Sequence, residues 1–226
     1  MARKRIKIAP SMMCADFLNM KGQLELFERT GVDYLHVDIM DGHYVPNFTL
    51  GPDFCRVLDG GSSIPLDIHL MIEDVDRYIP DFAGFEGAVV SFHPEVSYHP
   101  IRSLQLIKSC GARAGIALDP ALGLESIRYL LPEVSLVCVM TVNPGYAGQT
   151  LIPQALPKIK ELAGYISGQG LQVEIEVDGN VSWQNIPDML EAGADVLVAG
   201  SSSIFKSGED LEENIQRLKN LVNKKS

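Results

Sequence analysis

Short apolar segments alternate with amphipathic segments along the whole chain, and this alternation is the main signal for the fold. The apolar segments are rich in β-branched residues and have no polar face, which is typical of parallel strands covered on both sides. The amphipathic segments are typical of helices that pack one face on a sheet. The expected strands are 6–10, 34–40, 66–71, 87–93, 113–118, 136–142, 172–177 and 196–199.

One helix is expected after each strand, at 20–29, 53–58, 75–82, 100–110, 124–131, 154–167, 185–192 and 211–223. Gly31 is expected to end the first helix, and Gly60 and Gly61 the second. Eight strand–helix units in 226 residues predict an α/β fold, a single (β/α)8 TIM-barrel domain over residues 1–226. A doubly wound open sheet is the alternative. No GxGxxG follows the first strand, so the dinucleotide-binding form of that sheet has little support.

Composition narrows the classes of partner. The hydrophobic fraction of 46% supports a sizeable core, and the formal net charge of −10 argues against a nucleic-acid surface. An anionic small substrate is still compatible, because local backbone dipoles can hold a phosphate. The four cysteines form no CxxC, and no apolar run reaches the roughly 20 residues needed to cross a bilayer. We therefore expect a soluble cytoplasmic protein with free thiols and no membrane partner.

Four polar residues are expected at one end of the barrel, where the carboxyl ends of the strands carry function. His36 and Asp38 are two residues apart on one strand and so point to the same face. His69 lies on the next strand, and Asp178 follows the seventh. A lone strand histidine is more often a hydrogen-bonded core residue, but four such groups at matched depths favour a metal site. Two imidazoles and two carboxylates suit Zn, Mn, Co or Fe, and Mg less naturally.

Glycine-rich ends of the last three strands predict an anion site beside the metal. Glycines there let backbone N–H groups approach an anion, and a short helix expected from near Ser202 would aim its positive end at the same point. For each glycine taken alone, an ordinary turn is the alternative. The expected contacts are Gly145, Gly148, Gly179, Asn180, Gly200, Ser201 and Ser202.

Methionines end three of the strands that carry these groups. Met40, Met71 and Met140 fill core gaps in the simpler interpretation. Together they would form a soft apolar wall that excludes water beside the metal without donating protons to a carbanion. His93 also sits at a strand end and is a weaker candidate for lining the mouth.

Several longer motifs occur in order along the chain. They are APS at 9–11, HVDIMDGHYVPN at 36–47, DIHLM at 67–71, FHPE at 92–95, VNPG at 142–145 and EVDG at 176–179. With these motifs the chain resembles the ribulose-phosphate 3-epimerase family over nearly its whole length. The resemblance implies a (β/α)8 barrel that inverts C3 of a ketose phosphate.

Several residues in and near these motifs favour one branch of that family. PSMMC at 10–14, Gly42, Ala147 and the one-residue-longer GSSSIF at 200–205 match the D-allulose-6-phosphate 3-epimerase branch better than the pentose enzymes. The resemblance therefore implies D-allulose 6-phosphate to D-fructose 6-phosphate as the first expectation. D-Ribulose 5-phosphate to D-xylulose 5-phosphate is the alternative.

The candidate residues fit this chemistry. The C3 proton lies next to the C2 carbonyl, so its removal leaves an enediolate that a divalent cation would stabilise as a Lewis acid. Asp38 and Asp178 are expected to flank the substrate as exchangeable base and acid. The resemblance implies that Ser11 hydrogen-bonds a substrate oxygen. His36 and His69 are expected as metal ligands without acid–base duty, and His69 also as a substrate contact.

Other functions were weighed against this one. A non-catalytic sugar-phosphate-binding barrel would not need both aspartates. A Schiff-base aldolase needs a lysine at a strand end, and the strands carry none there. A metal-dependent hydrolase is compatible with the metal ligands, but three methionines beside the ion suit carbanion chemistry better. The expected partner is a small ketose phosphate, and the expected assembly is a homo-oligomer.

Overall fold

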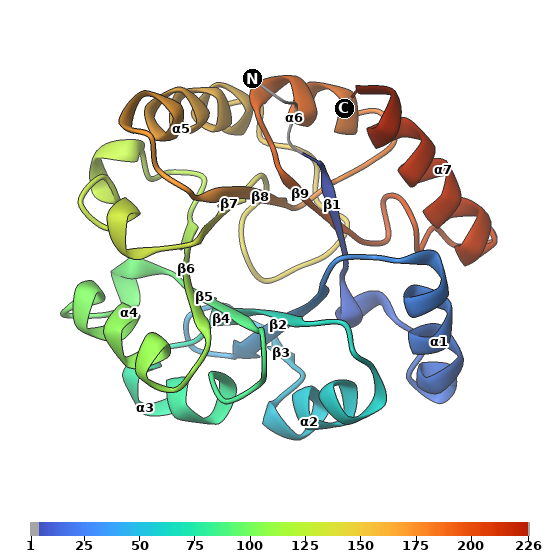
Figure 1. Ribbon diagram of the computed structural model, residues 1–226, viewed down its shortest axis with the longest axis horizontal. Helices are drawn as coiled ribbons and strands as arrows, with labels where there is room; N and C mark the ends of the chain where they lie inside the picture. The colour runs from blue at the N-terminus through green and yellow to red at the C-terminus, as the bar shows by residue number, and fades with distance from the viewer. Residues whose placement is uncertain (1–4, 226) are drawn as a thin grey trace.

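The computed structural model describes residues 5–225, and its strands form one barrel-like sheet ringed by helices (Figure 1). The strand order is β1-β9-β8-β7-β6-β5-β4-β2-β3, and every pair except β2 with β3 is parallel. The ring closes between β1 and β2 through a parallel bridge from Ser11 to His36. Residues 1–4 and 226 of the expected domain lie outside the described part. The predicted TIM-barrel-like fold is confirmed.

All eight predicted strands are present, three of them with the predicted bounds. They are β1 (Lys7–Pro10), β2 (Leu35–Asp41), β4 (Leu66–Met71), β5 (Val89–Phe92), β6 (Arg113–Leu118), β7 (Leu136–Met140), β8 (Glu174–Asp178) and β9 (Val196–Ala199). The sequence analysis missed β3 (Phe48–Thr49), which pairs antiparallel with the end of β2. Two residues are too few to show a strand periodicity.

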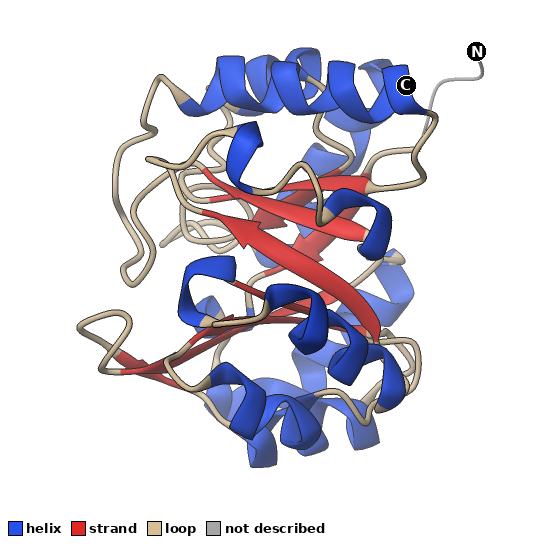
Figure 2. Cartoon of the chain, turned by 90° about the vertical axis from the view of Figure 1, so that its left-hand side faces the viewer, coloured by secondary structure: helices blue, strands red, loops and turns tan. Residues whose placement is uncertain are grey.

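Seven helices of the described residues pack outside the strands, as Figure 2 shows from the side. They are α1 (Met20–Thr30), α2 (Pro52–Gly61), α3 (Val75–Phe82), α4 (Pro100–Ser109), α5 (Ala155–Gln169), α6 (Ile186–Ala192) and α7 (Leu211–Lys225). Gly31 ends α1 in the left-handed conformation, as expected. The expectation that Gly60 and Gly61 stop α2 is wrong, because both belong to its last turn. None of these helices has the length and apolar character that a membrane span requires.

Two further predicted helices are not formed. Residues 124–133 contain two 3-10 turns, Leu124–Ser126 and Leu131–Glu133, and no α-helix forms over the predicted range 124–131. Their buried residues Leu124, Ile127 and Leu130 recur every third position, and a 3-10 turn satisfies that spacing as well as an α-helix does. The helix expected near Ser202 is a series of turns, in which the N–H groups of both Ser203 and Phe205 donate to the Gly200 carbonyl.

Side chains alternate between the two faces of each strand, and this alternation positions the site. On β2, Leu35, Val37 and Ile39 belong to the large apolar core shared with the helices. The residues between them, His36, Asp38 and Met40, therefore point into the barrel. The same alternation turns the polar residues of β4 and β8 inward. A second, smaller cluster fills part of the interior with Ala9, Tyr34, Val89, Ala117, Leu136, Cys138, Met140 and Val196.

Candidate active site

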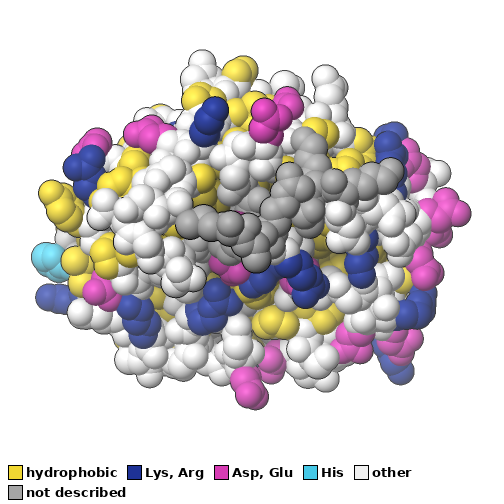
Figure 3. Space-filling view, turned by 45° about the horizontal axis from the view of Figure 1, so that its top comes forward, with side chains coloured by type: hydrophobic (Ala, Val, Ile, Leu, Met, Phe, Trp, Pro, Cys, Tyr) yellow, Lys and Arg dark blue, Asp and Glu magenta, His cyan; other side chains and the backbone are white. Residues whose placement is uncertain are grey.

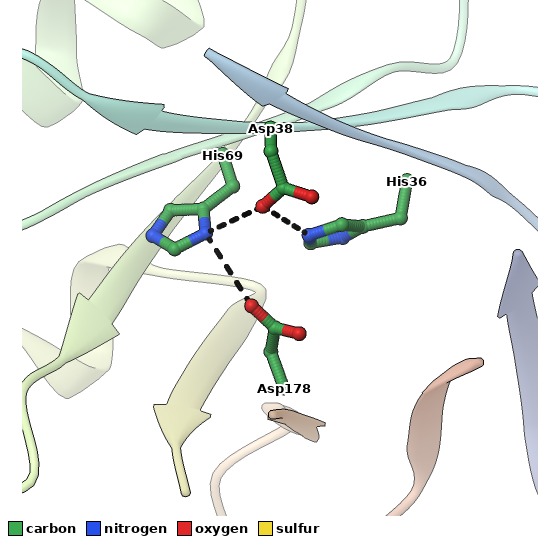
Figure 4. A group of neighbouring side chains, drawn as sticks. All are labelled: His36, Asp38, His69 and Asp178. Atoms are coloured by element: carbon green, nitrogen blue, oxygen red, sulfur yellow. Dashed lines mark hydrogen bonds and ion pairs between the residues drawn. The ribbon is translucent and has the colours of Figure 1, made fainter. Parts of the chain in front are cut away.

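Two histidines and two aspartates meet inside the barrel, as Figure 4 shows. We call His36, Asp38, His69 and Asp178 the quartet. One ligand atom from each lies within 4.8 Å of the others. Asp38 Oδ1 is 3.3 Å from His36 Nε2 and 3.6 Å from His69 Nδ1, and Asp178 Oδ2 is 3.9 Å from His69 Nδ1. The structure thus brings together all four residues predicted as metal ligands, from strands β2, β4 and β8.

The donor set fits a divalent metal ion. His69 is fully buried, yet its Nδ1 has no hydrogen-bond partner. A buried polar atom without a partner is costly, and this one faces two carboxylates. Mixed imidazole and carboxylate donors are suited to ions such as zinc, manganese, cobalt or iron. The quartet can therefore hold one such ion.

The buried carboxylate of Asp67 contacts the His36 ring at Nδ1, the nitrogen that does not face Asp38. Asp67 Oδ2 lies 2.6 Å from His36 Nδ1, and both side chains are fully buried. This contact favours a proton on Nδ1, so that Nε2 would offer its lone pair to an ion bound by the quartet. The sequence analysis did not assign Asp67 a role. Its position two residues before His69, on the same inward face, was the available signal.

Glu176 lies next to this pair and was also missed. Its Oε1 is 3.8 Å from His36 Nδ1, and neither carboxyl oxygen has a hydrogen-bond partner. Burial, together with the charge of Asp67, raises the pKa of Glu176 well above its ordinary value, which favours the protonated acid. Burial likewise raises the pKa of the neighbouring Cys138 thiol. The group of Asp67, Glu176 and Cys138 next to His36 therefore carries less negative charge than its number of acidic side chains would give.

The two aspartates of the quartet have opposite electrostatic surroundings. Burial alone would raise the pKa of Asp38, but the His36 and His69 rings outweigh it and hold that pKa well below its usual range. Burial and the nearby Asp38 charge raise the pKa of Asp178 to about 7. A bound cation would lower the pKa of both carboxyls. Ser11 Oγ donates a hydrogen bond of 3.1 Å to Asp38 Oδ2.

A cavity lies over the quartet at the carboxyl ends of the strands. Its lining includes both aspartates of the quartet together with the predicted substrate contacts Ser11, Met40, Met71, Met140, Gly145, Gly148, Gly179, Asn180, Gly200, Ser201 and Ser202. His36 and His69 are not among the lining residues and lie beneath them. Four residues that the sequence does not predict as contacts also line this cavity: Met13, Cys14, Tyr146 and Gln149. His93, the weaker candidate for lining the mouth, is fully buried and contacts His69.

One side of the cavity is made of turns that require glycine. Gly179 has a φ of +107°, and a Cβ there would lie 2.4 Å from Val142 Cγ2, so no larger residue fits without movement. Asn180 follows with φ of 44° and donates from Nδ2 to Ser202 Oγ at 3.4 Å. Because no helix forms at Ser202, any anion here would depend on the N–H groups of these turns.

The loop after β7 crosses the mouth and is fastened to the loop after β2. Figure 1 shows it in yellow over the centre of the barrel. Asn47 Nδ2 donates to the Gly145 carbonyl at 2.9 Å, and Tyr146 OH donates to the Pro46 carbonyl at 2.9 Å. A Cβ at Gly145 would lie 3.1 Å from Val45 Cβ. These contacts narrow the entrance to the cavity.

Comparison with known proteins decides the family. Residues 7–205 match the Ribulose-phosphate 3 epimerase family. The chain belongs to this family. It is 42% identical over 200 residues to the ribulose-phosphate 3-epimerase of Escherichia coli strain K12, covering 88% of this chain and 89% of that protein. It is 44% identical over 198 residues to the enzyme of the same name from Bacillus subtilis, covering 87% and 91%.

Solved structures with lower identity show the fold alone. A mutant tryptophan synthase α-subunit from Pyrococcus furiosus has a TM-score of 0.63 at 14% identity, covering 97% of this chain and 96% of that one. Thiamine phosphate pyrophosphorylase from the same organism has a TM-score of 0.60 at 13% identity, covering 98% and 97%.

The family membership makes the chain an isomerase that acts on a sugar phosphate, as expected from the motifs. The expected D-allulose-6-phosphate branch is less well supported. The relatives named here carry the pentose-family name, so the comparisons favour the alternative over the allulose branch. The residues at 10–14, 42, 147 and 200–205 favour the allulose branch, whereas the names of these relatives favour the alternative.

Proposed function

We propose that the protein interconverts D-ribulose 5-phosphate and D-xylulose 5-phosphate by inverting C3. The observation that carries the proposal is the pair Asp38 and Asp178, whose carboxyl groups enter one cavity from two separate strands, β2 and β8. Such a pair suits inversion, because the proton leaves one face of the carbon and returns on the other. The shared name of the relatives supports the pentose substrate.

Asp38 is the carboxylate that takes the C3 proton in one direction, from the side of the cavity that β2 forms. Asp178 delivers a proton from the opposite side, and the roles exchange in reverse. The quartet would hold a divalent ion, which when bound supplies Lewis-acid stabilisation of the charge that develops beside the C2 carbonyl. The Ser11 hydroxyl orients Asp38 and lines the cavity where a substrate oxygen would lie.

The methionine wall protects the reactive carbon. Met40, Met71 and Met140 are almost fully buried and line the cavity beside the aspartates. Their thioethers have no acidic proton, so they exclude water without quenching a carbanion from the wrong face. The proton returned to C3 would then come from a carboxyl group of defined position.

The turns at Gly179, Gly200 and Ser202 are the proposed phosphate contacts. They line the same cavity as the aspartates, and its glycines present backbone N–H groups without a bulky side chain. Successive N–H groups in such turns form concave sites for anions on a protein of any net charge. This explains how a chain of net charge −10 could bind a phosphate ester.

The hexose phosphate is the second candidate, supported by the longer loop at 200–205. A side-by-side assay decides between them: kcat/KM for D-ribulose 5-phosphate and D-allulose 6-phosphate, each with zinc, manganese, cobalt or iron added. We expect the pentose value to exceed the hexose value by at least about tenfold, which is about 1.4 kcal/mol of discrimination. The reverse order would replace the pentose proposal with the hexose one. Measuring kcat/KM of Asp178→Asn with both substrates shows whether the same site acts on both, because the value should then fall for each.

A further inference from the structure

His93 is a fully buried histidine that the proposed mechanism does not use. It directly follows β5, contacts His69 and is not among the residues that line the cavity. The two rings approach with Nε2 to Nε2 at 3.0 Å, ring centroids 5.1 Å apart and planes 32° apart. This is a hydrogen bond between two imidazoles, and its direction is set by which nitrogen carries the proton.

The position of His69 in the quartet fixes that direction. His69 Nδ1 lies 3.6 Å from Asp38 Oδ1 and 3.9 Å from Asp178 Oδ2, and it makes no hydrogen bond. An imidazole that binds an ion through Nδ1 keeps its proton on Nε2. His69 is then the donor of the 3.0 Å bond and His93 the acceptor, so the proton of His93 must sit on Nδ1.

The surroundings of His93 favour that tautomer. Glu95 Oε1 lies 3.4 Å from His93 Nδ1, and this nitrogen has no closer hydrogen-bond partner. Tyr44 OH donates to the same Glu95 oxygen at 2.9 Å, which holds the carboxylate in place. The Tyr44 ring also packs on the His93 ring, with centroids 4.8 Å apart. Glu95 and Tyr44 thus fix the orientation of His93 from two sides.

We propose that His93 is a positioning residue, which holds His69 as the tautomer with its proton on Nε2 and thereby raises the affinity of the quartet for a divalent ion. Glu95 and Tyr44 act by holding His93. The arrangement parallels Asp67 on His36, except that an imidazole backed by a carboxylate replaces the carboxylate itself. The inference rests on the proposed function, because it assumes that the quartet binds an ion.

Nitrogen chemical shifts of the zinc-loaded wild-type protein test the tautomers without any substitution. Long-range ¹H–¹⁵N spectra distinguish protonated from bare imidazole nitrogens. We expect a proton on Nε2 of His69, a bare Nε2 on His93 and a proton on Nδ1 of His93. A proton on His93 Nε2 would overturn the inference, since that ring could then not accept from His69.

Metal affinity of variants tests the consequence. His93→Phe keeps a ring between Tyr44 and His69 but removes the acceptor, and His93→Gln restores an acceptor near the position of Nε2. We expect the zinc dissociation constant, measured by competition with a chelator, to rise about 10- to 100-fold in His93→Phe, and most of that loss to be recovered in His93→Gln. His99→Gln, at an exposed histidine, is the matched control and should leave the constant unchanged.

The outcomes separate this inference from the proposed function. Wild-type zinc affinity in a folded His93→Phe protein overturns the inference alone. A wild-type protein that binds no divalent ion overturns the metal-dependent function and the inference with it. If His93→Phe does not fold, Glu95→Gln takes its place: a several-fold weaker affinity is expected, and an unchanged affinity with unchanged His93 nitrogen shifts contradicts the role of Glu95.

Discussion

Opposite environments at two nearby carboxyl groups are the central feature at the scale of residues. Asp38 lies between two imidazoles and accepts from the Ser11 hydroxyl, so its negative form is favoured. Burial and the nearby charge of Asp38 raise the pKa of Asp178 to about 7. Two titratable groups pushed apart in pKa are the usual basis for dividing base and acid roles in one site.

Replacing either carboxyl group tests that division. Asp38→Asn and Asp178→Asn remove a proton-transfer group with little change in shape, so kcat should fall by about 10²- to 10⁴-fold in each. Asp59→Asn, at an exposed position of α2, is the matched control and should retain wild-type activity. Circular dichroism should show that all three variants are folded. Near-normal turnover in either active-site variant would exclude the two-carboxylate mechanism.

Gly179 should be the least replaceable glycine of the cavity. Gly179→Ala would place a Cβ against Val142 at a positive φ, so we expect the free energy of unfolding to fall by about 1–3 kcal/mol and the KM for the sugar phosphate to rise. The matched control is Gly123→Ala, where φ is −97° and an added Cβ meets nothing within 4 Å. Equal stability of the two variants in urea titrations would contradict this account of the turn.

The sequence pattern predicted the residues of the quartet, but it did not predict the residues that contact them from behind. His36 and Asp38 are two positions apart on one strand, so their common face followed from strand geometry alone. The role of Asp67 depends instead on the register that pairs it with His36 across β2 and β4. The contact of Glu176 with His36 depends on how the barrel closes. The spacing along β4 and β8 shows that Asp67 and Glu176 face inward, but it does not show that they contact His36 on another strand.

At the scale of elements, a charged network joins strands at the end of the barrel opposite the site. Glu174, at the start of β8, accepts from Lys7 of β1 at 2.5 Å and from Arg113 of β6 at 3.2 Å. Tyr34, just before β2, accepts from both cations and donates to Glu174 at 3.2 Å. Polar groups at this end of a barrel serve stability, because function lies at the other.

The network predicts a pH dependence of stability. Burial alone would raise the pKa of Glu174, but Lys7 and Arg113 outweigh it and lower the pKa below its ordinary value. The folded state therefore binds the proton less readily than the unfolded chain, and the contribution is present above the unfolded pKa of about 4.3 and lost as the pH falls through the folded pKa. We expect Glu174→Gln to be less stable than wild type by about 1–3 kcal/mol at pH 7, with the difference shrinking below about pH 4.

Urea unfolding of both proteins between pH 3 and about 8 measures this difference. Glu133→Gln, which removes an exposed ion pair with Lys108, is the control and should cost less than about 1 kcal/mol throughout. A stability difference for Glu174→Gln that stays constant down to pH 3 would contradict the assigned cause, since protonation would then have no effect on it.

Element boundaries show where periodicity is informative. Strands 66–71, 113–118 and 196–199 and helix 75–82 were predicted to the residue, because each has a clear apolar pattern and flanking turn residues. Residues 124–131 were predicted as a helix because buried positions at i and i+3 fit both kinds of helix. The turns at 201–205 were missed because serines do not indicate whether a helix continues.

At the scale of the whole molecule, the quartet connects three strands that are far apart in the sequence. An ion bound by residues of β2, β4 and β8 would be held only by the folded barrel, so it should stabilise the fold. We expect a chelator to lower the melting temperature and to abolish activity, with both restored by adding a divalent ion. Activity that persists in a protein shown by elemental analysis to be stripped of metal would exclude the Lewis-acid role.

The homo-oligomer and the cytoplasmic location stay predictions from the sequence.

The most direct test of the central claim follows hydrogen at C3. D-Ribulose 5-phosphate is incubated with the protein in D₂O, and the products are followed by NMR. The account predicts that D-xylulose 5-phosphate forms with deuterium at C3, because the proton removed by one aspartate is replaced by a solvent-derived proton from the other, and that Asp178→Asn forms it far more slowly. Product that retains the original hydrogen at C3, or no conversion of this substrate by the wild-type protein, would contradict it.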